Sequence, residues 1–267
     1  MSGPVALVTG AARGIGAATV LALADSGWSV LAVDVATDEP VLPYPMGSLA
    51  ELTAVVAAGR ERSASADQIH ALVADVRDLD AMKAAVEEAE QRWGGLDAAI
   101  AAAGVIAGRM PQWQVPLQQE QVILDINLGG VLNLARAAVP ALLRRPEPRS
   151  GRFVAVASAA ATRGMPMLAA YSAAKAGVTG LIRALATELA GTGITVNAVS
   201  PGSTATPILD ESARLYDIPG AQSFAEQQPH QRLLEPGEVA AVLAFLASAA
   251  SSGMTGSVVP VDGGLAL

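Results

Sequence analysis

Short apolar runs alternate along this chain with longer segments whose apolar residues recur at helical spacing. Parallel strands buried on both faces read as continuous apolar runs, and crossover helices join them. The runs predict strands at residues 5–9, 29–33, 69–74, 98–102, 152–157, 195–199 and 257–261. The helical segments are residues 14–26, 79–92, 117–143, 171–190 and 236–250. The pattern predicts an α/β protein with a single-domain Rossmann fold, a doubly wound seven-stranded parallel sheet with helices on both faces.

Two long connections interrupt this alternation. Residues 35–68 join the second and third predicted strands, beginning with a proline-rich, partly apolar stretch and continuing into a helical segment at 50–60. Residues 201–235 follow the sixth predicted strand. Connections of this length are usually functional or disordered, and both are apolar enough to pack. We therefore expect one domain over residues 1–267, with an insertion at 35–68 and a substrate loop at 201–235.

Charge and composition exclude several classes of function. The net charge is −8, the sequence pI is near 4.8 and basic residues form no run of four or more, which argues against nucleic acid and anionic membranes as partners. The chain has no cysteine and only two histidines, far apart, so we expect no disulfide, no thiolate chemistry and no metal site. The first predicted strand begins at residue 5, leaving no room for a signal peptide, and we expect a soluble cytoplasmic protein without a membrane span.

A glycine-rich turn directly follows the first predicted strand. Residues 9–16 read Thr-Gly-Ala-Ala-Arg-Gly-Ile-Gly, between a buried strand and a helix. Glycines there allow a tight turn, close approach of a pyrophosphate and close packing of the helix on the sheet, with the phosphates at the helix amino terminus. Because the turn opens a βαβ unit, we interpret it as a dinucleotide-binding site rather than a merely structural turn.

Acidic residues near this turn indicate which dinucleotide binds. Asp34 ends the second predicted strand, where a carboxylate can bind the ribose hydroxyls and repel a 2′-phosphate. Arg13 would instead favour NADP, because it could pair with that phosphate. The carboxylate of Asp34 is closer, so we expect NAD to be preferred over NADP. Asp75 follows the third strand and is placed to bind the adenine amino group; capping the next helix is its alternative role.

A reacting centre is predicted around Tyr171 and Lys175, which lie four residues apart and so share one helix face. The pair combines a proton donor with a cation that can lower the pKa of the phenol. Chance alone rarely places such a pair in a chain with three tyrosines and two lysines. Ser158 ends the fifth strand and could hold a substrate oxygen. Asn127 is a polar residue inside an apolar helix, where it either serves the site or bends the helix.

Together these residues resemble the short-chain dehydrogenase/reductase family over nearly the whole chain. The family's glycine motif falls on residues 9–16, and its Asn-Ser-Tyr-Lys tetrad falls on Asn127, Ser158, Tyr171 and Lys175. Its Asn-x-x-x-Pro-Gly segment falls on residues 197–202, and a terminal Asp-Gly-Gly on 262–264. One departure is Ala-Ala-Ala-Gly at 101–104, where the family usually has Asn-Asn-Ala-Gly.

The resemblance implies the role of each residue. The tyrosine exchanges the substrate proton, the lysine binds the nicotinamide ribose, the serine orients the substrate oxygen and the asparagine holds a water in a proton relay. Thr206 would meet the nicotinamide carboxamide. The expected cofactor-binding residues are Thr9, Gly10, Arg13, Gly14, Ile15, Gly16, Asp34, Asp75, Val76, Ala103, Gly104, Tyr171, Lys175, Pro201, Gly202, Thr204 and Thr206. A homotetramer or homodimer is also implied, with the long fourth and fifth helices at an interface.

The insertion narrows the resemblance to one branch. Pro-Tyr-Pro-Met at residues 43–46 looks like the mycofactocin-associated, carveol-dehydrogenase-like enzymes, in which NAD stays bound and a peptide-derived carrier, mycofactocin, reoxidises it. Residues 35–60 could wrap over the adenosine end of the cofactor; a plain surface insertion is the alternative.

The sequence thus predicts an NAD-dependent oxidoreductase that acts on an apolar secondary alcohol or ketone. Apolar residues of the substrate loop, together with Met165, Met167 and Leu168, predict an apolar pocket. A non-catalytic NAD-binding sensor or scaffold is the alternative, although such a protein has no need of the tetrad. A sugar-nucleotide epimerase is a third possibility, disfavoured by the glycine spacing and the chain length.

Overall fold

Seven parallel strands form one sheet in the order β3-β2-β1-β4-β5-β6-β7 in the computed structural model, which describes residues 3–267. The strands are β1 (Val5–Thr9), β2 (Ser29–Asp34), β3 (Ile69–Val73), β4 (Ala98–Ala101), β5 (Arg152–Val156), β6 (Thr195–Pro201) and β7 (Val258–Val261). All seven predicted strands are confirmed to within two residues at either end. They are apolar because helices cover both faces of the sheet.

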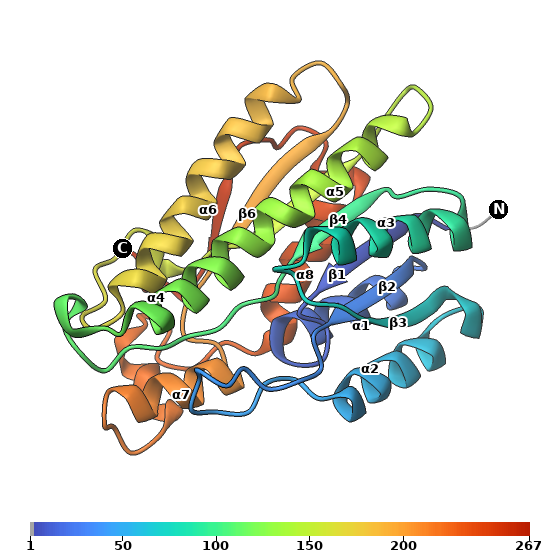
Figure 1. Ribbon diagram of the computed structural model, residues 1–267. Helices are drawn as coiled ribbons and strands as arrows, with labels where there is room; N and C mark the ends of the chain where they lie inside the picture. Colours follow the sequence, from blue (N-terminus) through green and yellow to red (C-terminus); the bar gives the residue numbers. More distant parts are fainter. Residues whose placement is uncertain (1–2) are drawn as a thin grey trace.

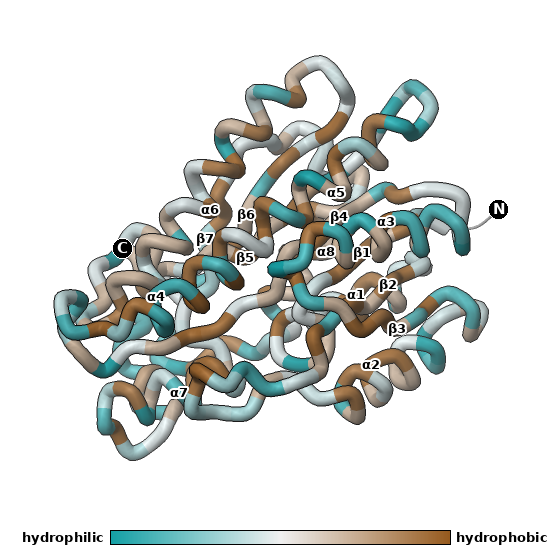
Figure 2. Tube along the Cα trace, viewed as in Figure 1, coloured by the Kyte–Doolittle hydropathy of each residue, from teal (hydrophilic) through white to brown (hydrophobic). Residues whose placement is uncertain are grey.

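Helices form a layer on each side of the sheet (Figure 1). They are α1 (Gly14–Asp25), α2 (Leu49–Arg62), α3 (Leu79–Trp93), α4 (Leu117–Leu124), α5 (Gly130–Arg144), α6 (Ala169–Glu188), α7 (Pro207–Leu215) and α8 (Pro236–Ala247). Helices α3, α5 and α6 bury their apolar sides in one core cluster, and α1, α2 and α8 in the other. Figure 2 shows the hydrophobic residues concentrated along the strands and the inner helix faces. The predicted doubly wound Rossmann fold is therefore confirmed.

The strand order reverses between β1 and β4. Successive strands run from β1 to β2 and β3 on one side, and from β4 to β7 on the other. Thr9 at the end of β1 pairs with Val33 of β2 and with Ala101 of β4, so the segments that leave these strands diverge above the same edge. Ligands of open α/β sheets bind in the crevice outside such a switch point.

The predicted helix at 117–143 contains a wider turn in its middle. Between α4 and α5 lies a π-helical turn (Asp125–Gly129), with the buried side chain of Asn127 inside it. Residues Leu117–Arg144 are long and apolar enough to cross a membrane by length and composition alone. This candidate span was not predicted from the sequence. Of its most apolar window, 56% is buried, and α5 packs on α3 and the sheet, as the core helix of an α/β domain does.

The insertion forms a loop that we call the strap, residues 35–48, between β2 and α2. Side chains of its middle part, including Leu42 and Met46, are buried in the core cluster on the α3 side. Ser48 then caps α2 by accepting a hydrogen bond from the backbone N–H of Glu51. The strap is therefore a packed part of the fold.

Candidate active site

A cavity of about 640 Å³ runs along the carboxyl ends of the central strands. Of the residues expected at the site, all but Thr9 line this one cavity. The lining set is Gly10, Arg13, Gly14, Ile15, Gly16, Asp34, Asp75, Val76, Ala103, Gly104, Asn127, Ser158, Tyr171, Lys175, Pro201, Gly202, Thr204 and Thr206. The fold thus brings together residues from most of the chain, as the sequence analysis expected.

The glycine turn is shaped by close backbone contacts. Gly10 has a φ of +68°, and a Cβ there would lie 2.6 Å from the Cα of Ala103. A Cβ on Gly16 would overlap the carbonyl oxygen of Gly10. These positions exclude side chains and leave the amino terminus of α1 open to the cavity, which is the arrangement that receives a pyrophosphate.

Asp34 lies at the end of β2 with only 8% of its surface exposed. Its Oδ2 accepts a hydrogen bond of 2.9 Å from the backbone N–H of Ala12, and its Oδ1 accepts one of 3.2 Å from that of Ala36. The carboxylate is therefore held rigidly between the glycine turn and the start of the strap. The remaining lone pairs of its oxygens can accept from ribose hydroxyls.

Asp75 makes an ion pair that the sequence analysis did not foresee. Both of its carboxylate oxygens accept hydrogen bonds from Arg77, whose guanidinium also contacts Glu39 of the strap at 2.8 Å. Arg77 thereby holds the pKa of the Asp75 carboxyl below its usual range against the effect of burial. The helix that follows is capped by Asp78 rather than by Asp75.

Thr9 has a supporting place behind the cavity. Its Oγ1 accepts hydrogen bonds from the backbone N–H groups of Ala102 and Ala103, at 3.2 and 3.4 Å. This hydroxyl, 1% exposed, ties the Ala-Ala-Ala-Gly segment to β1 where the family's usual asparagines are missing. Thr9 therefore positions the cavity wall and does not line it.

Asn127 is bonded on every side within its π-helical turn. Its amide nitrogen donates to the carbonyl oxygens of Val105 and Ile123, both at 2.9 Å, and its Oδ1 accepts from the backbone N–H of Val105 at 3.2 Å. Both donor protons are used, so the side chain can only accept one further bond. Asn127 thus lies in a π-helical turn and lines the cavity, and its part in the reaction stays a prediction.

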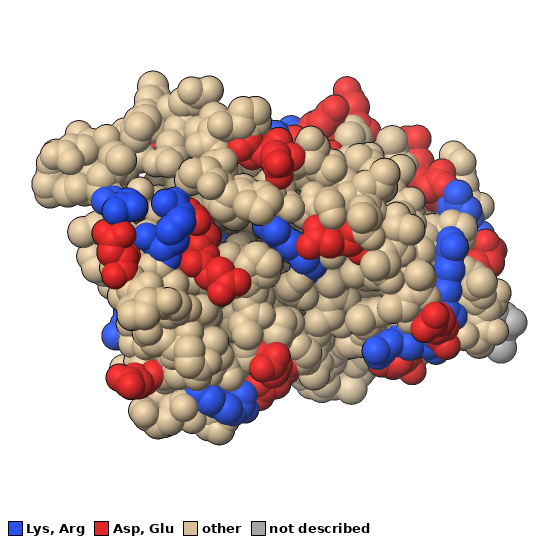
Figure 3. Space-filling model, turned by 90° about the horizontal axis from the view of Figure 1, so that it is seen from below, with Lys and Arg blue, Asp and Glu red and all other residues tan. Residues whose placement is uncertain are grey.

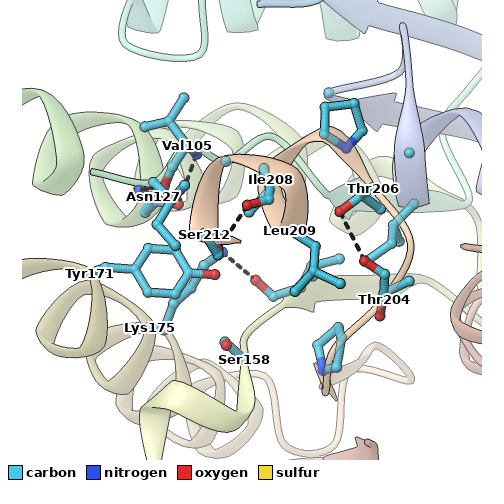
Figure 4. A pocket seen from close by; sticks show the side chains of 18 of the residues that line it. Val105, Asn127, Ser158, Tyr171, Lys175, Thr204, Thr206, Ile208, Leu209 and Ser212 are labelled. Atoms are coloured by element: carbon cyan, nitrogen blue, oxygen red, sulfur yellow. Dashed lines mark hydrogen bonds between the residues drawn. The ribbon is translucent and has the colours of Figure 1, made fainter. Parts of the chain in front are cut away.

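Tyr171 and Ser158 face each other across the cavity floor (Figure 4). The Oγ of Ser158 accepts from the backbone N–H of Ala160 at 3.1 Å, so its own proton stays available to a neighbour. Burial raises the pKa of Tyr171, and a hydrogen bond with Ser158 opposes that rise. The lowered pKa expected from the sequence is therefore not found, because burial outweighs the nearby groups.

Lys175 lies one helical turn beyond Tyr171 and is 4% exposed. Its ammonium group donates to the carbonyl oxygen of Val156 at 2.9 Å and lies 5.8 Å from the centroid of the Tyr171 ring. Burial lowers the pKa of Lys175 to about 8, because a charged ammonium is poorly solvated there. The other two donor protons point to no protein partner among the described residues, so they can serve a ligand.

The substrate loop closes the opposite side of the cavity. Thr206 lies just before α7, and its Cγ2 would be 3.3 Å from a Cβ built on Gly14. The substrate loop and the glycine turn are therefore in close contact at this point. Apolar side chains line the cavity beyond Tyr171, all of them predicted: Met165, Leu168, Pro207, Ile208, Leu209, Tyr216, Ile218 and Phe224. Met167 is instead 45% exposed outside it.

The strap supplies residues that the sequence analysis did not place at the site. The strap begins after Asp34 at the end of β2, extends to Tyr44 and then comes back, so that Gly47 lies beside the Asp34 side chain. At its outer end the Tyr44 hydroxyl accepts from Ile106, and its ring packs in the apolar cluster of Ile106, Leu168 and Leu215. The strap therefore lines the cavity through residues such as Glu39 and Met46, and through Tyr44 it also contacts the apolar cluster at the substrate end. The proline-flanked tyrosine was the one signal for this contact.

On the face drawn in Figure 3, charged side chains occur as small groups of opposite sign and form no continuous basic patch. No group of metal-binding side chains is found among residues 3–267.

Comparisons with known proteins agree with this geometry. A family model described as enoyl-(acyl carrier protein) reductase matches residues 10–266. The chain is 35% identical to a (−)-trans-carveol dehydrogenase from Rhodococcus erythropolis, covering 100% of this chain and 99% of the relative. It is also 35% identical to a 3-oxoacyl-acyl-carrier-protein reductase from Thermotoga maritima, with the same coverage. The solved carveol dehydrogenase from Mycobacterium avium in complex with NAD superposes with a TM-score of 0.92 at 32% identity, covering 99% of this chain and 98% of the other.

Proposed function

The chain belongs to the short-chain dehydrogenase/reductase family, and we propose on that premise that it is an NAD-dependent oxidoreductase interconverting an apolar secondary alcohol and its ketone. The observation that carries the proposal is the convergence of Asn127, Ser158, Tyr171 and Lys175 on one cavity beside an open helix amino terminus. The relatives named above are dehydrogenases and reductases, which lends no support to a non-catalytic sensor or scaffold.

The lining of the cavity suits NAD at both of its ends. Gly10 and Gly16 let the turn pack tightly against neighbouring backbone, which leaves the amino terminus of α1 open to a pyrophosphate, and Asp34 offers acceptors for ribose hydroxyls at the end of β2. The free donor protons of Lys175 lie at the other end, beside Tyr171. NAD supplies the hydride acceptor when it is bound, and NADH the donor.

The protein groups then handle the proton and the substrate oxygen. In oxidation, the phenolate oxygen of Tyr171 accepts the proton of the substrate alcohol, and in reduction the Tyr171 hydroxyl donates that proton to the carbonyl oxygen. Because burial disfavours its phenolate, the positive charge of Lys175 is needed close by to stabilise that form. Ser158 donates its hydroxyl proton in a hydrogen bond to the substrate oxygen. Asn127 holds the segment around Gly104, which forms a wall of the site.

An apolar, cyclic or terpenoid-sized alcohol is the substrate class that the lining supports. The substrate end is bounded by aliphatic and aromatic side chains from α7 and from the segment before α6. Besides Ser158 and Tyr171, the cavity is lined by the polar side chains of Arg163, Ser212 and Gln227, and Arg163 and Ser212 already donate to backbone carbonyl oxygens. The similarity to a carveol dehydrogenase points to the same class.

Retention of NAD, with reoxidation in place by mycofactocin, is the finer part of the proposal. The strap contacts Arg77 at the adenosine end, Arg13 at the turn and Ile106 at the substrate end. Release of a dinucleotide from beneath it would require several of these contacts to break. The same contacts make a mere surface insertion the less favoured alternative.

A cytoplasmic homotetramer or homodimer completes the proposal. Trp113, in a short turn before α4, and Leu117, the first residue of α4, are 84% and 76% exposed, and apolar side chains so placed favour burial against another subunit. The packing of α5 against α3 and the sheet favours a location in the cytoplasm over one in a membrane.

The test is nicotinamide reduction by the purified protein with a panel of cyclic and terpenoid secondary alcohols, each with free NAD and again with an artificial electron acceptor. Sustained turnover with NAD alone would establish an exchanging dehydrogenase and remove the retention hypothesis. A single stoichiometric burst, sustained only by the acceptor, would support retained NAD. Silence across the panel, with NAD bound in calorimetry, would count against this substrate class.

A further inference from the structure

The strap returns to the exact residue from which it departs, the carboxylate at the end of β2. A Cβ built on Gly47 would lie 2.8 Å from the Cβ of Ala12 and 3.1 Å from Oδ1 of Asp34. Gly47 is buried, and Met46 before it is 9% exposed. The backbone at Gly47 therefore fills the space beside the carboxylate, with no room for even a methyl group.

Arg13 is the basic residue of the glycine turn, and the strap holds it. Its guanidinium donates a hydrogen bond of 2.8 Å to the carbonyl oxygen of Pro45, two residues before Gly47. An arginine near this turn is the group that accommodates the 2′-phosphate in NADP-binding proteins of this fold. Here that group is directed to a backbone carbonyl of the strap.

From these contacts we infer that NADP is rejected jointly by Asp34 and by the strap. Asp34 repels the 2′-phosphate by its charge. Residues 45–47 occupy the space beside Asp34 and engage Arg13, so that both the volume and the cation that a 2′-phosphate needs are withheld. The strap is thus a determinant of cofactor specificity. This inference rests on the proposed use of NAD.

Neutralising Asp34 alone should therefore leave NADP poorly bound. The test measures NAD and NADP binding by calorimetry, after bound nucleotide has been removed, for four proteins. They are the wild type, Asp34→Ser, a variant in which a Gly-Ser-Gly turn replaces residues 38–47, and the combination of both changes. Because Gly47 lies beside Asp34, the excision joins chain ends that are already close.

We expect Asp34→Ser to raise NADP affinity by less than about tenfold, and the combined variant by at least about tenfold more, as for one added charge-assisted contact. Arg13→Ala in the combined variant should abolish the additional gain. Arg62→Ala in the same background is the matched control, because Arg62 pairs with Asp25 on the surface outside the cavity and its loss removes equal charge.

Folding of the excised variant is checked by circular dichroism melting. Should it not fold, Tyr44→Ala with Asp34→Ser replaces it, since loss of the outer anchor loosens the strap; the expected change has the same direction and a smaller size. Full NADP affinity in Asp34→Ser alone would overturn the inference, as would an excised or loosened variant that gains none. Wild-type protein that binds neither nucleotide would instead overturn the proposed function itself.

Discussion

The hydroxyl oxygen of Tyr44 accepts a hydrogen bond of 2.9 Å from the backbone N–H of Ile106, 62 residues further along the chain. The bond fixes the outer end of the strap to the segment after β4, next to the candidate reacting centre. Burial raises the pKa of Tyr44, which favours the protonated hydroxyl near neutral pH.

Tyr44→Phe should accelerate the release of NADH about tenfold, because the Ile106 N–H loses its partner and the strap its outer anchor. Stopped-flow displacement, followed by NADH fluorescence, measures this rate. Tyr216→Phe is the matched control: the Tyr216 hydroxyl donates to the carbonyl oxygen of Pro166 at 2.7 Å in the same region but holds no strap residue. Equal release rates for both variants would show that the anchor does not limit release.

Tyr171→Phe should lower kcat by at least about a hundredfold, the usual contribution of a positioned general acid or base. The ring and its packing remain, so the dissociation constant for NAD should stay within about twofold. Steady-state rates together with calorimetry separate the two quantities. Turnover near the wild-type rate would refute the assignment of Tyr171 as the proton-transfer group.

Lys175 should make the stability of the nucleotide-free protein depend on pH. Its pKa is about 8 in the folded state against 10.5 for an ordinary lysine, so the unfolded chain binds more protons between these values. The free energy of unfolding should therefore rise from pH 8 to about 10.5, by on the order of 3 kcal/mol from this residue.

Urea unfolding of the wild type and of Lys175→Met at several pH values in this window measures that contribution. The difference in free energy of unfolding, wild type minus variant, should grow with pH. A difference that stays constant would mean that Lys175 titrates at its ordinary pKa in the folded protein.

Thr9→Val should destabilise the protein by about 1–3 kcal/mol, because two backbone N–H groups behind the cavity lose their acceptor. Weaker NAD binding should accompany this loss, since the Ala103–Gly104 wall is no longer tied to β1. Thr19→Val is the control: the Thr19 hydroxyl only donates to a carbonyl of its own helix. Thermal melts and calorimetry of both variants provide the comparison, and equal melting temperatures would contradict the role given to Thr9.

Periodicity in the sequence was enough to predict the sheet and most helices, because buried parallel strands and amphipathic helices each leave a local pattern. The π-helical turn at Asn127 was beyond that reasoning. Within this wider turn the Asn127 amide donates a hydrogen bond to the carbonyl oxygen of Val105, which lies 22 residues earlier in the chain. A contact so distant in sequence leaves no local pattern. Helix α7 was likewise hidden inside the expected substrate loop, since nine residues give too short a pattern to stand out.

At the candidate site, the motifs pointed to residues that do line one cavity, because these motifs lie at the carboxyl ends of strands. Contacts of the strap could not be predicted in this way. The ion pair of Arg77 with Glu39 and the bond of Ile106 to Tyr44 depend on the path of a loop without periodicity. The sequence showed that the strap was long and apolar, but not what it reaches.

Because Tyr44 packs in the cluster around Ile106, Leu168 and Leu215, the strap is also part of the wall behind the substrate. Anyone redesigning this protein for another alcohol meets a constraint here. Enlarging the pocket at Leu168 removes packing from the anchor, so a variant selected for a bulkier substrate should also acquire a more readily exchanged cofactor. We therefore expect selectivity and cofactor exchange to change together, so that both should be varied and screened in one library.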